Sequence, residues 1–278
     1  MSEPLTLMAV HAHPDDESGS TGGVLARYSA EGVRTVVVTC TNGEYGDAAE
    51  GVKPGDPDHD PEFVRKLRLS ELDAAIAALG VSHLERFGYH DSGMIDWAFK
   101  EGEVFYNVPI EEPTARLVEL FERYRPQVVV TYDENGGYGH PDHIQAHRVT
   151  MAAIEASPIP AKLYFTARKR SDMERIRTVL EERGIEVPAR RAAQEMDPAR
   201  RAAMEEREAR ITTTVDVAEY CEHKRAALAA HDSQSHNIWW LRMPSEATNL
   251  VFTHESFIRA HDTTGTPTPE TDLFAGLR

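Results

Sequence analysis

Cysteine is scarce in this sequence: its 278 residues include two, Cys40 and Cys221, which lie far apart and outside any metal-ligand spacing. Two isolated cysteines exclude a disulfide framework and a cysteine-based zinc site, and they indicate a reducing compartment in which each packs as a small apolar residue. Apolar runs of membrane-spanning length are also lacking, and residues 1–4 lack the basic region and apolar stretch of a secretion signal. We therefore expect a cytoplasmic protein with no membrane partner.

Basic residues are outnumbered by acidic ones, 30 Lys and Arg against 46 Asp and Glu, which gives a formal net charge of −16. A nucleic-acid partner needs a basic face that neutralises phosphates, so this balance argues against one. The charge does not identify a substrate. The length is sufficient for one large α/β domain, or for a domain with an appendage.

What the sequence does contain is an alternation of apolar runs and amphipathic stretches through its first part. The apolar runs predict strands at residues 5–13, 35–41, 84–89, 127–132 and 162–166. Helices are predicted at residues 21–30, 62–79, 113–124 and 142–156. Repeated strand–helix order is typical of a mostly parallel sheet with helices on both faces. We therefore predict an α/β, Rossmann-like, metal-binding catalytic domain over residues 1–167.

The composition changes after this part. Residues 171–210 are dense in Arg, Glu and Ala and predict two charged helices around a break at residues 184–188. A strand at residues 212–217 and a helix at residues 218–230 follow, and a Pro- and Thr-rich tail closes the chain over residues 257–278. We expect residues 168–278 to pack on the same domain as a smaller helical and strand region that forms part of the pocket.

Two clusters of imidazoles and carboxylates each follow an apolar run. The first, after residues 5–10, is His13-Pro14-Asp15-Asp16-Glu17, and the second, after residues 127–132, ends in His140-Pro141-Asp142-His143. If both runs are buried parallel strands, both clusters lie at the carboxyl edge of one sheet, where open α/β sheets bind ligands. Two such clusters supply the parts of a catalytic metal centre with a general base beside it.

The residue types fit a catalytic zinc ion, which keeps three ligands drawn from His and carboxylate and leaves a fourth position for water. His13 and Asp16 are three residues apart in a strand-to-loop turn and can reach one metal ion, and His143 is the natural third ligand. Zinc is the default metal for these ligands, and iron(II) also suits them. His147 is a weaker candidate ligand, and we expect it to pack behind the site.

Three residues beside these ligands carry the remaining chemistry. Asp15 is a carboxylate that the metal does not need, placed where a general base belongs. His140 is a nearby imidazole that can donate a proton or stabilise an oxyanion. Tyr138 could add a phenolic hydrogen bond to the same oxygen.

Three other interpretations are open at this stage. A single His-Pro-Asp is typical of a turn, but two of them, each closing an apolar run, favour a site. Clusters of His and Asp also build two-metal phosphoesterases, although the single imidazole of the first cluster favours one metal. The third interpretation is a non-catalytic metal- or sugar-binding protein, and Asp15 argues against it because it is not needed as a ligand.

With their flanks, the two clusters resemble the paired signatures of the LmbE/PIG-L de-N-acetylases. The matching stretches are residues 10–18, Val-His-Ala-His-Pro-Asp-Asp-Glu-Ser, and residues 131–143, Thr-Tyr-Asp-Glu-Asn-Gly-Gly-Tyr-Gly-His-Pro-Asp-His. The sequence is most similar to the actinobacterial mycothiol branch, which contains the N-acetylglucosaminyl-inositol deacetylase and the mycothiol S-conjugate amidase. Further similarity at residues 68–72, 91–94 and 270–277 extends the resemblance over nearly the whole chain.

This resemblance implies zinc-dependent hydrolysis of an N-acyl amide. By position it implies that His13, Asp16 and His143 are the zinc ligands and that Asp15 is the general base that activates water. The same alignment of motifs implies groups around the reacting carbonyl: His140 as acid or oxyanion stabiliser, Tyr138 as a mobile tyrosine that polarises the carbonyl, and Asp142 as a carboxylate that orients the neighbouring histidine.

Two more positions resemble those that hold sugar or inositol hydroxyls, namely Arg68 and Asp91. We expect the Arg68 guanidinium to project away from the core toward the strand ends, where its planar fork suits hydroxyl pairs. The alternative is an ion pair of Arg68 with Asp91 or Glu71 that only ties a helix to a loop.

Details of the motifs divide between the two enzymes of this branch. Ser20 and Gly139 match the deacetylase, whereas the pair Glu134-Asn135 leans toward the amidase. The acidic loop at residues 43–61 matches neither well and should border the pocket. The resemblance therefore implies a zinc-dependent N-deacetylase acting on a glucosamine-containing small molecule such as N-acetylglucosaminyl-inositol. A mycothiol S-conjugate amidase and a tailoring deacetylase of a secondary metabolite are the alternatives, and homo-oligomerisation is left open.

Overall fold

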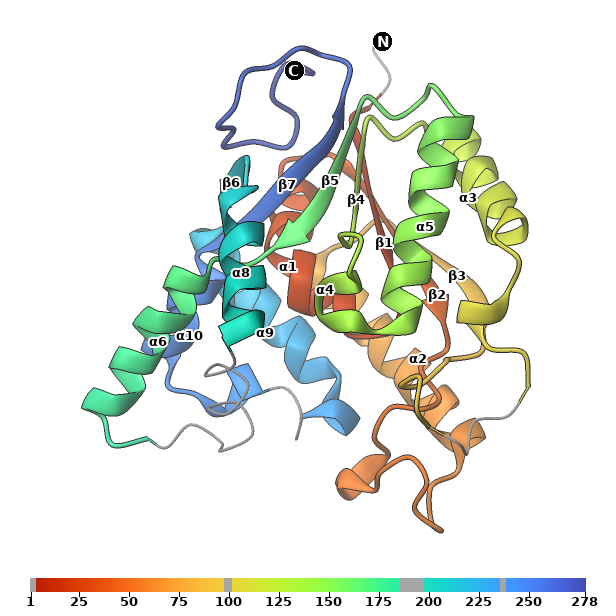
Figure 1. Ribbon diagram of the computed structural model, residues 1–278, viewed down its shortest axis with the longest axis vertical. Coiled ribbons are helices and arrows are strands. Elements are labelled where there is room, and N and C mark those ends of the chain that lie inside the picture. The colour runs from red at the N-terminus through yellow and green to blue at the C-terminus, as the bar shows by residue number, and fades with distance from the viewer. Residues whose placement is uncertain (1–3, 98–101, 186–197, 236–238) are drawn as a thin grey trace.

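A single twisted sheet forms the centre of the computed structural model, which describes residues 4–97, 102–185, 198–235 and 239–278 (Figure 1). The strand order is β3-β2-β1-β4-β5-β7-β6. Strands β1 to β5 are parallel, and β7 runs antiparallel to both β5 and β6. The bounds are β1 Thr6–His11, β2 Arg34–Thr41, β3 His83–Tyr89, β4 Val128–Thr131, β5 Lys162–Ala167, β6 Thr213–Asp216 and β7 His254–Asp262.

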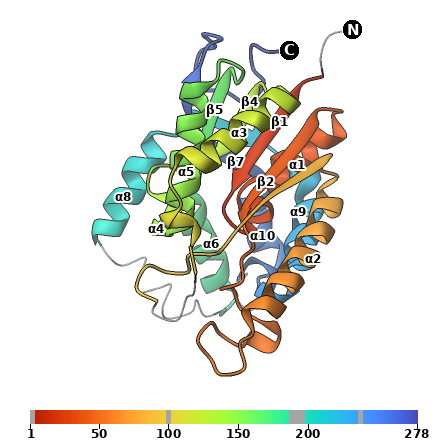
Figure 2. The ribbon, with the colours of Figure 1, turned by 90° about the vertical axis from the view of Figure 1, so that its right-hand side faces the viewer.

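Helices cover both faces of the sheet. Figure 2 shows α1 (Asp16–Ala30), α2 (Pro61–Leu79) and α9 (Cys221–Ala230) on one side, with α3 (Glu111–Tyr124) and α5 (Pro141–Ala156) on the other. Every residue of β1 and β4 is buried, as is expected of central parallel strands that pack against helices on both faces. The predicted mostly parallel sheet with helices on both faces is confirmed.

Local signals at the helix ends explain where two important helices begin and end. The Asp60 side chain accepts hydrogen bonds from the amides of Glu62 and Phe63, at 3.0 and 3.3 Å, and so caps α2. Gly80 ends that helix in the left-handed conformation, which agrees with the helix predicted to end at residue 79. In the second cluster Pro141 occupies the first helical position of α5, where its fixed φ suits a helix start.

The first helix begins earlier than the predicted residue 21. It starts at Asp16, so the first cluster itself forms the opening turn of α1. This earlier start was not predictable from the local sequence, because the turn begins with Asp15, whose φ of 106° and ψ of −26° are unusual for a residue with a side chain. The predicted helix at residues 218–230 is confirmed with a 3-10 turn at its start.

The C-terminal region adds strands to the same sheet and helices at its edge. The charged stretch contains α6 (Arg170–Glu182) and α8 (Pro198–Ala209), while residues 186–188 of the predicted break lie outside the described residues. The division of the chain at residue 167 stays a prediction. The remaining short helices are η1 Ala49–Gly51, η2 Phe105–Asn107, α4 Gly136–Gly139, η3 Ala218–Tyr220, η4 Asp232–Gln234, η5 Trp239–Arg242 and α10 Ser245–Phe252. None of the helices among the described residues is long and apolar enough to cross a membrane.

No strand was predicted at the start of the Pro- and Thr-rich tail, but β7 spans His254–Asp262. This strand was missed because it carries buried polar residues in place of a continuous apolar run. Its Glu255 is 5% exposed and accepts hydrogen bonds from the amides of Gly23 and Val24 in α1 and from the Lys224 ammonium. Burial of this carboxylate depends on partners that the local sequence does not reveal.

The end of the chain is anchored by one buried carboxylate, Glu270. It accepts hydrogen bonds from Lys162 at 2.6 Å and from Tyr164, Thr213 and Arg259 at 2.9 Å. Glu270 and Lys162 are both fully buried, so removal of the Glu270 charge leaves the Lys162 ammonium uncompensated in a medium of low polarity.

We predict that Glu270→Gln lowers the free energy of unfolding by about 3 to 5 kcal/mol, because Lys162 loses its counter-charge. Urea unfolding followed by circular dichroism measures this. The matched control is Arg278→Ala, which removes partly exposed ion pairs with Glu31 and Asp272 and should cost less than about 1 kcal/mol. Equal midpoints for Glu270→Gln and the unsubstituted protein would contradict the anchor.

Candidate metal centre and active site

Both predicted clusters lie at one edge of the sheet, at the carboxyl ends of β1 and β4. These strands pair in parallel, with Leu7 opposite Val128 and Ala9 opposite Val130. The strand order changes direction between them, because β2 and β3 lie beyond β1 while β5 lies beyond β4. Open α/β sheets bind ligands at such a switch point. The predicted meeting of the two clusters is confirmed.

Three candidate ligand atoms form a small triangle at this edge. Nδ1 of His13 lies 3.2 Å from Nε2 of His143 and 3.3 Å from Oδ2 of Asp16, and the remaining side, from His143 to Asp16, is 3.4 Å. Atoms bound to one tetrahedral zinc ion at about 2.0 to 2.2 Å lie about 3.3 to 3.6 Å apart. The triangle therefore has the size that three ligands of one metal ion require.

The other nitrogen of each of these two imidazoles is bound to the protein. Nε2 of His13 donates to Oδ2 of Asp142 at 3.1 Å, and Nδ1 of His143 donates to the carbonyl of Gly136 at 3.0 Å. Asp142 is held in turn by the amide of Ser92 at 2.8 Å and by the Ser92 hydroxyl. Such partners fix the tautomer of a metal-ligating histidine and point its free lone pair at the metal.

The charge around the triangle favours a cation. Burial acts to lower the pKa of His13, but the carboxylates of Asp91 and Asp142 raise it well above its usual value. Burial likewise acts to raise the pKa of Asp16, but His143 and His13 hold it well below its usual range. A pocket that attracts a proton to this degree also attracts a metal ion, which releases that proton on binding.

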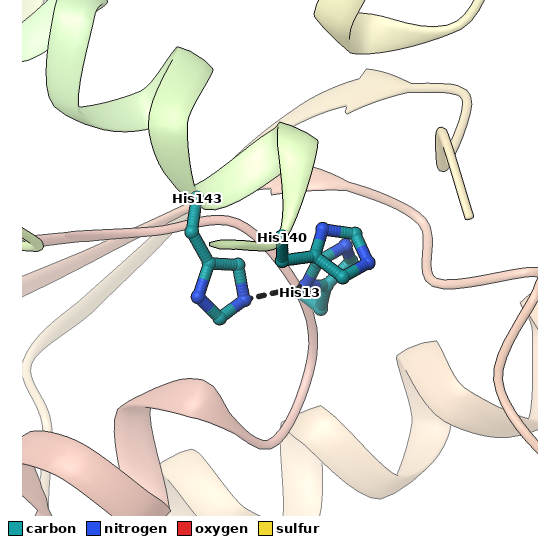
Figure 3. Close-up of side chains that lie close together, drawn as sticks. All are labelled: His13, His140 and His143. Atoms are coloured by element: carbon teal, nitrogen blue, oxygen red, sulfur yellow. Dashed lines mark hydrogen bonds between the residues drawn. The ribbon is translucent and has the colours of Figure 1, made fainter. Parts of the chain in front are cut away.

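His140 is close to the triangle without being part of it. Figure 3 shows its ring beside that of His13, and the two ring centroids are 4.5 Å apart. The nitrogens of His13, His140 and His143 lie within 4.8 Å of one another, but Nδ1 of His140 accepts the amide of Asp142 at 3.2 Å. Burial, reinforced by His13 and His143, lowers the pKa of His140 to about 2. The ring is therefore neutral and presents Nε2–H as a hydrogen-bond donor.

Asp15 lies beside the triangle and is bound by an arginine. Its Oδ2 accepts from Nη2 of Arg68 at 2.9 Å, and its side chain is 29% exposed. The loss of hydration among the surrounding groups raises the pKa of Asp15 to about 6, although Arg68 acts in the opposite direction. Left-handed backbone at a residue with a side chain is strained and is common at active sites. The carboxylate is thus a partly accessible, weakly basic group next to the candidate metal position.

Tyr138 lies at the mouth of the site. Its side chain is 62% exposed, and its ring centroid is 5.0 Å from that of His143 and 6.0 Å from that of His140. It belongs to the short helix α4 between β4 and α5, which contains three glycines with positive φ: Gly136, Gly137 and Gly139. A phenol on such a backbone can turn toward a substrate held over the imidazoles.

The structure shows where Arg68 and Asp91 lie. Arg68 is 3% exposed and donates to the carbonyls of Gly43 and Pro14 as well as to Asp15, which follow β2 and β1, so its guanidinium does project toward the strand ends. The ion pair that it forms is with Asp15, so the alternative pairs with Asp91 or Glu71 are wrong. Asp91 is 3% exposed, accepts from the amide of Gly93 and lies 3.6 Å from Nε2 of His13. The contact of either residue with substrate hydroxyls stays a prediction.

Sequence reasoning missed a buried pair behind the general-base position. Oε2 of Glu17 accepts the amide of Asp15 at 2.9 Å, and Oε1 accepts from Nε2 of His231 at 2.9 Å. Both side chains are fully buried. Glu17 thus holds the strained Asp15 peptide, and His231, which lies far along the chain, holds Glu17. Its position after a helix gave no local signal for this contact.

Two residues of η4, which follows His231, connect the C-terminal region to α2 and to the acidic loop. Ser233 donates from its amide and its hydroxyl to Glu71 of α2, both at 2.7 Å. Gln234 exchanges two hydrogen bonds with the backbone of Asp47, at 2.8 and 3.2 Å. The acidic loop at residues 43–61 is therefore attached at Asp47 to the C-terminal region.

Comparison with known proteins gives this geometry a context. The PIG-L family, described as GlcNAc-PI de-N-acetylase, matches residues 8–154. A mycothiol S-conjugate amidase of Streptomyces coelicolor is 36% identical and covers 100% of this chain and 99% of its own length. A 1D-myo-inositol 2-acetamido-2-deoxy-alpha-D-glucopyranoside deacetylase of Saccharomonospora viridis is 43% identical over 82% of this chain and 84% of its own.

A solved structure shares the fold. The N,N'-diacetylchitobiose deacetylase from Pyrococcus horikoshii superposes with a TM-score of 0.60 at 16% identity, over 96% of this chain and 88% of that one. At this identity the likeness concerns the fold alone. It agrees with the mostly parallel sheet described above.

We predict that the protein binds about one divalent ion per chain and that His13→Ala, Asp16→Ala and His143→Ala each abolish this binding. A site with three protein ligands has none to spare, so loss of one sharply lowers metal affinity. Elemental analysis after dialysis measures the ion content.

The matched control for metal content is His140→Ala, which removes a neighbouring imidazole from outside the triangle. We expect it to keep its metal. Stoichiometric metal in both His13→Ala and His143→Ala, or its loss in His140→Ala alone, would contradict this ligand set.

Proposed function

The chain belongs to the PIG-L family of GlcNAc-PI de-N-acetylases, and from this we propose that it is a zinc-dependent N-deacetylase of a small amino-sugar glycoside. Family membership makes it an amide-hydrolysing enzyme. The observation that carries the rest is the triangle of His13, Asp16 and His143 with the non-ligand carboxylate of Asp15 beside it.

The donor set of the triangle fits a catalytic metal. Two imidazoles and one carboxylate hold zinc in many hydrolases, and each imidazole has the hydrogen-bonded partner that a ligand needs. A zinc ion bound there would act as a Lewis acid on the acyl carbonyl and would lower the pKa of a water toward about 7. Iron(II) accepts the same ligands, and we propose zinc because the reaction is hydrolytic.

Asp15 is the general base in this proposal. With a pKa near 6 its carboxylate is mostly ionised at neutral pH, which suits a group that removes a proton from water and later returns it to the leaving amine. Arg68 holds Oδ2 of that carboxylate, and Glu17 holds its backbone amide. Both contacts keep the base aimed at the space beside the triangle.

Two groups would stabilise the oxygen that becomes negative as the acyl carbon is attacked. The neutral ring of His140 offers Nε2–H, and Tyr138 offers its phenolic hydrogen; donors placed before the reaction stabilise such charge most effectively. Asp142 would orient His13, since that is the imidazole its carboxylate contacts.

We further propose an N-acetylglucosaminyl-inositol type of substrate. Ser20 and Gly139 match the deacetylase of the mycothiol branch, and the Saccharomonospora viridis deacetylase is more similar over its aligned part than the amidase is. A mycothiol S-conjugate is the second candidate, because the Streptomyces coelicolor amidase aligns along the entire chain and the pair Glu134-Asn135 resembles it. Both cysteines are free and buried, which supports a cytoplasmic location.

For the general base, we predict that Asp15→Asn keeps its metal and lowers kcat by about 100- to 10,000-fold, the usual contribution of general base catalysis. Asp16→Asn should instead lose metal and activity together. Metal analysis and initial rates on the same preparations separate these outcomes. An Asp15→Asn protein with full metal and near-native turnover would remove the base from this position.

A substrate panel tests the function itself. N-acetylglucosamine, N-acetylglucosaminyl-inositol and a mycothiol S-conjugate are compared by amine release, with acetate measured in parallel. We expect kcat/KM to be highest for N-acetylglucosaminyl-inositol, with equimolar acetate. Preference for the S-conjugate would identify an amidase, and phosphate release from phosphoesters without amine release from any amide would overturn the proposal.

A further inference from the structure

The loop that carries Tyr138 is held from outside the site by the charged helix α8. Arg207 of α8 donates from Nη1 to the carbonyl of Gly137 at 2.9 Å, and its Nε lies 2.7 Å from Oδ2 of Asp133. Arg210, just after α8, pairs with Glu134. Both ribbon views show α8 beside α4 (Figures 1 and 2). The sequence predicted only a charged helix here, yet Arg207 in α8 and Arg210 just after it both contact the segment that leads to Tyr138.

Contacts around Gly137 form a closed ring. The amide of Gly137 donates to Oδ1 of Asp133 at 2.9 Å, its carbonyl accepts from Arg207, and Arg207 pairs with Oδ2 of the same Asp133. The Asp133 side chain is 1% exposed and that of Arg207 is 22% exposed, so water weakens this ring little. The amide and the carbonyl of Gly137, the residue before Tyr138, are therefore both fixed.

The backbone at this point needs such support. Gly137 has φ 77° and ψ −57°, the combination of the rare classic γ-turn. Glycine has no Cβ and can adopt this conformation and leave it readily, so contacts of its amide and carbonyl are needed to keep it there. Without the ring, we expect the segment between Gly136 and Gly139 to relax through its glycines and to carry the phenol of Tyr138 with it.

The same loop also contacts a candidate metal ligand. The carbonyl of Gly136 accepts from Nδ1 of His143, and a Cβ at Gly136 would lie 2.7 Å from Cβ of His143. That close approach fixes the first half of the loop independently of α8. Arg207 therefore acts mainly on the second half, which carries Tyr138.

We propose that Arg207 is a positioning residue that holds the Gly137 peptide so that the Tyr138 phenol lies over the imidazoles of His140 and His143. This proposal rests on the proposed function, in which Tyr138 stabilises charge on the substrate. It assigns the charged region after residue 197 a part in turnover, although that region lies outside the family match at residues 8–154.

The test compares Arg207→Met with a matched control, Arg170→Met. Arg170 also pairs with α8, through Glu205, and with Glu174 of its own helix, but these acids belong to α6 and α8 and not to the loop. We expect Arg207→Met to lower kcat by about 10- to 100-fold, the scale of a small misplacement of a catalytic group, with metal content close to that of Arg170→Met. Its melting temperature should also fall, because the buried Asp133 loses its counter-charge.

A double-mutant cycle separates positioning from a general structural role. In a Tyr138→Phe background, Arg207→Met should lower kcat no further, because the group it positions is already gone. Equal fold losses with and without the Tyr138 hydroxyl would overturn the proposal. Loss of the metal ion in Arg207→Met but not in Arg170→Met would overturn it as well.

Hydrogen exchange supplies a readout that does not depend on activity. The amides of Gly137 and Tyr138 should exchange at least about tenfold faster in Arg207→Met than in Arg170→Met, since local opening controls exchange. Unchanged exchange rates would show that Arg207 does not hold the loop, whatever the substrate. If the unsubstituted protein releases no amine from any amide, the proposed function fails, and the role of Arg207 in Tyr138 catalysis fails with it.

Discussion

The parallel pairing of β1 with β4 is the constraint on which the site depends. The two motifs are separated by more than a hundred residues of chain, and only adjacent strands that end at the same edge bring His13 within 3.2 Å of His143. Each strand leads through a short connection into a helix whose first turn carries candidate metal-site residues. β1 leads into α1 at Asp16, and β4 leads through α4 into α5 at Pro141. Because the strands are buried on both faces, their register cannot slip without exposing the core. The distances within the triangle therefore depend on the packing of the sheet.

A second constraint is the number of acids and imidazoles enclosed at this edge. Each of the main carboxylates has a cation or donor of its own: Asp15 has Arg68, Glu17 has His231, and Asp133 has Arg207. Buried pairs of this kind add little net stability, because desolvation offsets the attraction, but loss of one partner is costly. Their effect is to favour one arrangement over others. In this protein each pair holds the backbone or the carboxylate of a residue beside the triangle. The pairs therefore determine the positions of the groups proposed to act on the substrate.

The sequence was sufficient for those features whose signals are local. Apolar runs predicted β1 and β4, and periodicity predicted a helix at residues 142–156 that corresponds to α5, so the two clusters could be placed together from the sequence alone. Features that depend on distant partners could not be found. The carboxylate partner of Arg68 is Asp15, which lies on another element. The burial of β7 was not predictable because the strand contains the charged residue Glu255, whose partners are in α1 and α9. His231 follows α9 with no neighbour in sequence that indicates Glu17. Periodicity and motif spacing carry no information on such contacts.

These contacts also change which part of the chain is needed for a working site. Every residue proposed to touch the metal or the acyl group lies before residue 144, yet the groups that hold Asp15, the acidic loop and the Tyr138 loop come from His231, Gln234 and Arg207. A catalytic group displaced by even a fraction of an ångström loses much of its effect. Proteins with the same two motifs can therefore differ in rate and substrate through residues far outside them. In this fold the motifs supply the reacting groups, and the C-terminal region sets the positions from which they act.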